Sequence, residues 1–433
     1  MKFNSWTLTT MKFNSWTLTT LAALASAQSN VPLVANQSDP GLLADPQRAG
    51  PTPELVHLFY DLWPTGIAVS RSGRMFCNYP RGLDPTNIAY TVAEIFPNNT
   101  ERAYPNATYQ TPPEGLIDDS TNPATSVGNP NYLTGVQSVV IDPADRLWIL
   151  DTGRTATPDG TILNASPGGV KLVGVDLTTN EVFKTIVFDT MAAPAVSYFN
   201  DVRFDLSPDL TSSGQGLAYI TDSSSVGLNA IVVVDLGTGE AWRRLQRHHS
   251  VQGDVGFVPI IWGEPVWNNQ TGMPTADAFN FGADGIALSA DNKELFYSTT
   301  GGRELWSIST ALLRARDRNA ELVARAAVKY RGETGFKDGM ETDSNGMIYA
   351  GDLEDNSLSY FNPVNNQLST LIRDPRFSWT DTLSVGFDGY LYFTENQLWL
   401  SPQYWYGRER RVKPWSLWRI KLPNGGTKVT QVV

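Results

Sequence analysis

The chain of 433 residues is long enough for several ordinary domains or for one large repeat fold. Hydrophobic residues make up 41% and charged residues 18%, which excludes a disordered chain, and 36 Gly with 27 Pro favour a turn-rich β protein. The formal net charge of −11 argues against nucleic acid or an anionic membrane surface as a partner, because like charges repel at long range.

The first 27 residues are predicted to be a signal peptide. Residues 1–10, MKFNSWTLTT, recur as residues 11–20, and we interpret this duplication as an artefact because no folding argument requires it. The second copy runs into an apolar stretch that ends in Ala25-Ser26-Ala27, the small-x-small pattern of a signal peptidase site. We therefore expect cleavage after Ala27, an N-terminal extension over residues 28–53, and a secreted, extracellular protein. No later run of about 20 apolar residues follows, so we expect no membrane insertion.

Five Asn-x-Ser/Thr motifs predict N-glycosylation in exposed loops, at Asn36, Asn98, Asn106, Asn164 and Asn269. Together with the signal peptide they favour passage through a secretory pathway. Cys77 is the only cysteine, so no disulfide can form within the chain. We expect this thiol to be buried in a strand.

A phrase of two apolar runs around a polar turn occurs six times after residue 60. The first runs of the six phrases begin at Gly66, Val136, Asp201, Asp284, Asp338 and Asp381. Each phrase predicts a strand, a hairpin turn and a second strand, and third and fourth alternating runs often follow. Four antiparallel strands per unit are typical of β-propeller blades. We predict an all-β, six-bladed β-propeller with four-stranded antiparallel blades over residues 54–433.

Two further segments complete this predicted architecture. A closed ring needs both chain ends in one blade, and the strand-like runs 54–61 and 417–422 are expected to pair there. Residues 310–327 are rich in Ala, Leu, Arg and Glu and predict one short helix between blades.

The amino-acid sequence of several of these segments resembles that of the major royal jelly protein and Yellow family, and the resemblance extends across nearly the whole predicted mature chain. The similar segments are LWILDTG at 147–153, AYITD at 218–222, FGADGIALS at 281–289, KDGM at 337–340 and WTDTLSV at 379–385. The resemblance implies a six-bladed propeller, an extracellular location and a ligand site at the mouth of the central channel; some relatives bind amines or convert dopachrome. Insect members carry cysteine pairs that this chain lacks, which indicates a microbial, fungal-type branch.

Acidic residues recur where the first strand of each unit would face the channel entrance. Asp201, Asp284, Asp338 and Asp381 occupy that position in four units, Gln137 and Asn200 add neutral oxygen atoms, and Phe281 and Phe336 lie nearby. We predict that these eight residues form a site for a small aromatic or amine-like ligand, because carboxylates and ring faces both attract a cation. The alternative is that the aspartates only serve turns and hydrogen bonds between blades.

A calcium ion is a further alternative, with Asn200 and Asp284 as its oxygen donors. The first unit reads Trp63-Pro64-Thr65-Gly66 and has no acid where calcium-dependent lactonases carry one, so no metal and no cofactor is assigned. Three functions stay open: a ligand-binding protein, an enzyme of the dopachrome-isomerase or calcium-dependent lactonase type, and a structural extracellular interaction protein. The sequence does not determine the oligomeric state.

Overall fold

A computed structural model describes residues 48–268 and 277–430. The predicted signal peptide, residues 28–47 of the N-terminal extension, Asn36 and Asn269 lie outside these described residues. The described part forms a compact unit that begins at Ala49. None of its helices is long and apolar enough to cross a membrane.

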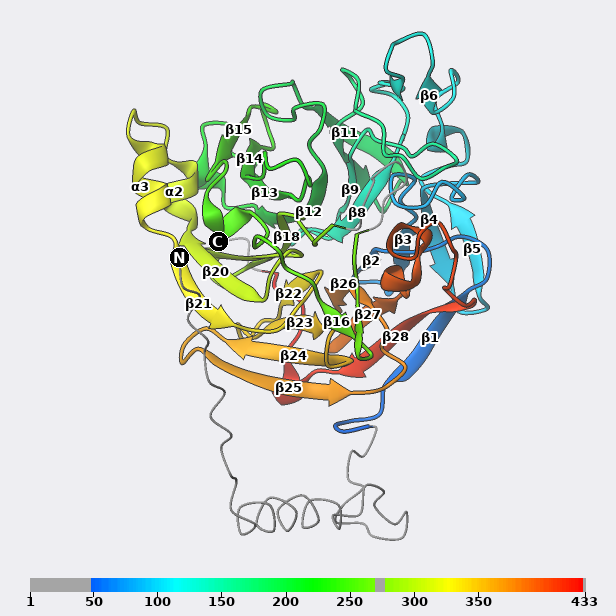
Figure 1. Cartoon of the computed structure of the whole chain (residues 1–433). Helices are drawn as coiled ribbons and strands as arrows, with labels where there is room; N and C mark the ends of the chain where they lie inside the picture. Colours follow the sequence, from blue (N-terminus) through cyan, green and yellow to red (C-terminus); the bar gives the residue numbers. More distant parts are fainter. Residues whose placement is uncertain (1–47, 269–276, 431–433) are drawn as a thin grey trace, which may run out of the picture. The chain divides into compact units, whose positions relative to one another are not determined.

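Six four-stranded antiparallel sheets follow one another along the chain and lie around a common centre (Figure 1). Blade 1 consists of β2 (Ile67–Val69), β3 (Met75–Asn78), β4 (Val92–Phe96) and β5 (Thr100–Ala103). Blade 2 consists of β8 (Val136–Ile141), β9 (Leu147–Asp151), β10 (Lys171–Asp176) and β11 (Glu181–Val187). Blade 3 consists of β12 (Phe199–Asp205), β13 (Leu217–Asp222), β14 (Ile231–Asp235) and β15 (Ala241–Arg244). Blade 4 consists of β18 (Ala283–Leu288), β19 (Glu294–Thr299), β20 (Glu304–Ser309) and β21 (Lys329–Glu333). Blade 5 consists of β22 (Met340–Thr342), β23 (Ile348–Asp352), β24 (Ser357–Asn362) and β25 (Gln367–Arg373). Blade 6 consists of β26 (Thr380–Val385), β27 (Tyr390–Glu395), β28 (Trp415–Lys421) and β1 (Glu54–Phe59). Two short hairpins, β6 (Ile117–Asp118) with β7 (Thr125–Ser126) and β16 (Ile260–Ile261) with β17 (Glu264–Pro265), lie in the connections.

The first strands of the blades form a closed ring. Contacts run from β2 to β8, β12, β18, β22 and β26 and back to β2. Between blades the sheets bury aromatic and β-branched side chains, as where Trp148 of blade 2 stacks on Phe204 of blade 3 with ring centroids 5.2 Å apart. The predicted six-bladed β-propeller is confirmed.

Blade 6 closes the ring by combining the two ends of the described chain. Strand β1 pairs antiparallel with β28, placing Phe59 opposite Trp415 and Glu54 opposite Arg419. Phe59 is fully buried in the core. The predicted pairing of the segments 54–61 and 417–422 is therefore confirmed, and it leaves β1 as the outer strand of the blade.

Hairpin turns and the single cysteine also follow the expectations. Asp145 and Asn292 adopt positive φ values of 62° and 58° in turns between first and second strands. Their short polar side chains tolerate this left-handed conformation. Cys77 is fully buried in β3, where burial raises the pKa of its thiol.

The predicted helix between blades needs correction. Residues 310–327 form two helices, α2 (Thr310–Arg314) and α3 (Ala320–Ala326), and these lie within blade 4, between its third and fourth strands. The backbone leaves the helical conformation at Ala315, where ψ is 138°, and the Asp317 carboxylate then accepts a hydrogen bond from the backbone N–H of Asn319 at 2.9 Å, just before α3. Such local bonds compete with helix continuation.

Side chains at the ends of second strands tie some blades to the start of the next first strand. Asn78 donates to the carbonyls of Val136 and Gln137 at 3.2 and 2.9 Å, and the Thr221 hydroxyl donates to the Asp284 carbonyl at 2.7 Å. These bonds fix the strand starts that carry the predicted site.

Candidate functional site

A cavity of about 300 Å³ lies at the starts of the first strands. Its polar lining includes Gln137, Asn200, Asp284, Asp338 and Asp381, and its aromatic lining includes Tyr198, Phe279, Phe281, Trp379 and Tyr404. Six of the eight predicted site residues therefore share one cavity, because Phe281 joins the five polar ones. The other two, Asp201 and Phe336, do not line it.

Irregular strand pairing directs these side chains. The register shifts between Val136 and Ser138 in β8 and between Phe199 and Val202 in β12. It also shifts at Asp284 in β18 and at Asp381 in β26. A β-bulge re-aims a side chain at the position where regular pairing stops, so the cavity is built from bulged strand starts.

Two glycines bring neighbouring strand starts close together. A Cβ atom on Gly285 would lie 2.3 Å from the Asp338 carbonyl oxygen, and one on Gly339 would lie 2.7 Å from the Asp381 carbonyl oxygen. Both distances are too short for any side chain. The Asp-Gly pairs of the sequence thus serve blade packing as well as placing carboxyl groups in the cavity.

Asp284, Asp338 and Asp381 form what we call the carboxyl cluster, and all three are buried. Neutral groups donate hydrogen bonds to them. Asp284 accepts from Asn200 at 2.6 Å and from Thr300 at 3.0 Å. Asp338 accepts from the Trp379 indole N–H at 2.8 Å, and Asp381 accepts from the Asn396 amide at 2.7 Å.

No positive side chain in the described part of the chain forms an ion pair with the carboxyl cluster, and the hydrogen bonds to it come from neutral groups. Burial is the largest influence and raises the pKa of Asp284 to about 7; the pKa values of Asp338 and Asp381 rise well above the usual range, first by burial and then by the neighbouring carboxyl groups. Burial and the neighbouring carboxyl groups therefore both favour protonated forms of the cluster.

Asp201 belongs to a separate, charged arrangement below the cavity lining. Its carboxylate accepts from the Ser138 hydroxyl at 2.8 Å and forms an ion pair with Arg203 at 2.9 Å. Arg203 also lies 3.6 Å from the Glu341 carboxylate. The expectation that Asp201 joins the ligand-facing ring is therefore corrected: this carboxylate already has its cation.

Phe336 also has a different place from the one expected. It is fully buried behind the cavity, with ring centroids 5.9 Å from Phe279 and 5.5 Å from Trp379. Phe279 in turn stacks on Tyr404 at 5.1 Å. Phe336 supports the aromatic lining from outside.

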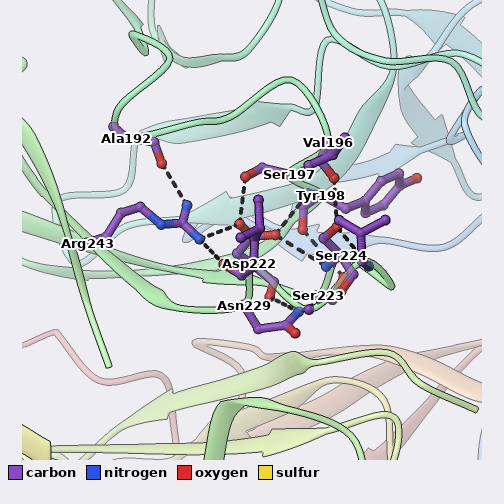
Figure 2. A network of polar contacts seen from close by, with 12 residues as sticks. Ala192, Val196, Ser197, Tyr198, Asp222, Ser223, Ser224, Asn229 and Arg243 are labelled. Carbon is purple, nitrogen blue, oxygen red and sulfur yellow. Dashed lines mark hydrogen bonds and ion pairs between the residues drawn. The ribbon is translucent and has the colours of Figure 1, made fainter. Parts of the chain in front are cut away.

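A network around Asp222 holds the residues that enter the cavity from blade 3 (Figure 2). At the end of β13, its carboxylate accepts from the Ser197 hydroxyl at 2.7 Å, the Tyr198 N–H at 3.0 Å and Arg243 at 2.8 Å. The hydroxyl of the next residue, Ser223, accepts a bond from Asn200 at 3.1 Å. The network therefore orients both Tyr198 and Asn200. Its charged members, Asp222 and Arg243, do not line the cavity.

Comparison with known proteins agrees with this architecture. The model of the family described as "Major royal jelly protein" matches residues 134–404, more than half of the chain. The chain belongs to the major royal jelly protein family. The matched region contains every residue of the carboxyl cluster and of the aromatic lining.

Individual members of the major royal jelly protein family are distant in sequence. Major royal jelly protein 1 of Apis mellifera is 23% identical over 53% of this chain and 49% of its own length. The Yellow-related salivary protein M35 of Phlebotomus duboscqi is 26% identical over 63% of this chain and 62% of its own length. The chain thus spans about half to three fifths of the length of these relatives. A solved luciferin-regenerating enzyme, 10% identical, covers 88% of this chain and 99% of its own with a TM-score of 0.50, a likeness of fold alone.

The predicted calcium donors and glycosylation sites have different outcomes. Asn200 and Asp284 bond to each other, and among the described residues no group of three or more His, Cys, Asp or Glu side chains could hold a metal ion. Asn98 and Asn106 are exposed. Asn164 is half-buried and lines the cavity, so this predicted exposed-loop position needs correction.

Sequence reasoning missed the acids that support the site. Asp151, Asp222 and Glu395 each end the second strand of a blade and accept backbone N–H bonds from residues that precede the first strand of the same blade. For Glu395 burial raises the pKa to about 8. The recurrence of an acid at this place in three units was the available signal. Tyr404 gave none, because it comes from the connection between β27 and β28.

Proposed function

We propose that this protein is secreted and binds a small aromatic amine in the cavity at the centre of the propeller. The observation that carries the proposal is the carboxyl cluster: three buried acids face one cavity, and their partners are neutral. A protonated amine would supply the missing positive charge. Its ring would lie against the aromatic lining.

Electrostatics favours a cation over a neutral ligand here. A buried carboxyl group without a cation stays neutral because the charged form loses its hydration. Bringing an ammonium group into the cavity offsets that loss, since attraction between opposite charges is stronger away from water. The faces of Phe281, Trp379 and Tyr198 add cation–π attraction of about 0.5–2 kcal/mol. A volume of about 300 Å³ suits a ligand with one or two rings.

Secretion is supported by the relatives rather than by the described residues. The names of the two matched relatives place them in royal jelly and in saliva, and both fluids are secretions. Exposure of the glycosylation motifs at Asn98 and Asn106 agrees with the same route.

A matched pair of ligands tests the binding function. Calorimetric titration with 2-phenylethylamine and with 2-phenylethanol compares an ammonium with a hydroxyl on the same ring. We expect the amine to bind at least about tenfold more tightly, about 1.4 kcal/mol, and Asp284→Asn to remove most of that preference. Asp209→Asn, an exposed position outside the cavity lining, is the matched control. Equal affinity for amine and alcohol would contradict the proposal.

A second candidate, an isomerase of the dopachrome-converting type, draws on one specific observation. Asp284 lines the cavity beside other buried acids, and its pKa is about 7, which suits a group that gives and takes a proton at neutral pH. The loss of dopachrome absorbance with intact protein and with Asp284→Asn tests it. Equal rates for both proteins, or no rate above buffer, would remove this candidate.

A further inference from the structure

Burial without a cation favours protonated forms of the acids at the proposed amine site. Asp284 and Asp338 are buried and line one cavity, and the groups that donate hydrogen bonds to them, Asn200, Thr300 and the Trp379 indole, are neutral. Asp381 contributes a third buried acid whose hydrogen-bond partners, Asn396 and Thr382, are neutral. Three negative charges in this space would repel one another with no cation in contact.

The charged and titratable groups around the cluster do not replace those protons. Arg203 pairs with Asp201 and Glu341, and Lys171 pairs with Asp151 at 2.9 Å. The Arg154 guanidinium donates hydrogen bonds to the backbone carbonyls of Ile162, Leu163 and Val196. The remaining titratable neighbours are acids or phenols that stay neutral when buried: Glu395, Tyr198 and Tyr404.

We propose that the carboxyl cluster binds a primary ammonium group in exchange for a proton of its own, so that about one proton leaves the protein for each amine bound. The inference rests on the proposed binding function and specifies its ligand class. Charge is conserved, because one cation enters as R–NH₃⁺ and one proton passes to the solvent. A primary ammonium has three N–H donors, which can bond to carboxyl groups of the cluster in place of the proton that leaves.

This exchange has a defined pH dependence. The free amine stays protonated up to about pH 10, whereas the cluster loses a proton more easily as the pH rises. Affinity therefore increases with pH from about 5 towards 7. Where one full proton is released, the association constant rises about tenfold per pH unit.

Calorimetry in two buffers of different ionisation enthalpy counts the protons directly. We would titrate the intact protein with 2-phenylethylamine at pH 6 in phosphate and in bis-tris. The expected difference corresponds to about one proton released per ligand. Asp338→Asn should bind the amine while releasing less than half a proton, because the substitution removes one of the acids that can give up a proton. Asp209→Asn should match the unaltered protein.

The outcomes separate the exchange from the binding function. Tight binding with equal heats in both buffers and a flat pH profile overturns the exchange and leaves amine binding intact. No binding of 2-phenylethylamine overturns both. Trimethyl(2-phenylethyl)ammonium keeps the charge and lacks the N–H donors, so equal affinity for this probe also overturns the exchange. The pH series uses the unaltered protein and does not depend on whether a variant folds.

Discussion

Arg203 lies among the inner strands with two carboxylates, and replacing it by methionine tests how the centre of the propeller is held together. Its guanidinium pairs with Asp201 at 2.9 Å and Glu341 at 3.6 Å, and it donates to the carbonyls of Val202 and Met340. Its side chain and that of Asp201 are each only 8% exposed. Neither carboxylate has another cation within ion-pair distance in the described part of the chain.

The expected cost follows from this isolation. Arg203→Met keeps much of the apolar stem but leaves Asp201 and Glu341 without their cation. Removing one partner of a buried ion pair costs about 3–5 kcal/mol, because the other charge stays buried and uncompensated. The double variant Asp201→Asn with Arg203→Met removes one of these charges. It should recover at least about 1 kcal/mol of that loss.

Chemical denaturation, monitored by tryptophan fluorescence, gives the free energy of unfolding of both variants. The single Asp201→Asn variant completes the double-mutant cycle. The coupling free energy between Asp201 and Arg203 is obtained from the four proteins. A loss below about 1 kcal/mol for Arg203→Met, or strictly additive effects of the two substitutions, would refute the reasoning that this pair is desolvated and mutually dependent.

Three other predictions concern the ring, the cavity and pH. Truncation of the chain before residue 60 removes β1, including Phe59, and should lower the free energy of unfolding by at least about 3 kcal/mol in the same denaturation assay; unchanged stability would contradict closure through blade 6. Phe281→Ala should weaken binding of 2-phenylethylamine roughly fivefold, about 1 kcal/mol, in calorimetric titration with little change in stability. The pKa of Glu395 is raised in the folded protein to about 8, so the folded state binds this proton more tightly than the unfolded state does. The contribution of this acid to the free energy of unfolding therefore falls as the pH rises from about 4.5 to 8. Glu395→Gln should flatten that slope, as seen in unfolding midpoints at pH 5 and pH 8, whereas an equal slope in both proteins would show that Glu395 is ionised when folded.

Much of the fold was predictable because its signals are local. Alternation of apolar residues marks a strand wherever it occurs, and Asp145 or Asn292 marks a turn through its own backbone preference. Six repeats of one phrase then imply six similar sheets. The helix prediction failed at the same scale, since composition favoured one helix, while the backbone leaves the helical conformation at Ala315 and the Asp317 side chain forms a local hydrogen bond between the two helices.

The candidate site was predictable only in part. The sequence places an aspartate at the start of four first strands, which is enough to expect carboxyl groups near the channel. It does not show that Asp201 has a cation while Asp284, Asp338 and Asp381 each have a neutral partner. Nor does it show that Tyr404, far along the chain from Phe279, stacks on that ring.

The sequence by itself therefore determined the number of blades, the pairing of the chain ends and the types of residue around the centre, because periodicity and turn chemistry act over a few residues. Tertiary structure alone decided which aspartates face the cavity. Bulges at the strand starts choose the direction of each side chain, and the neighbouring blades decide whether a cation or a neutral donor meets it.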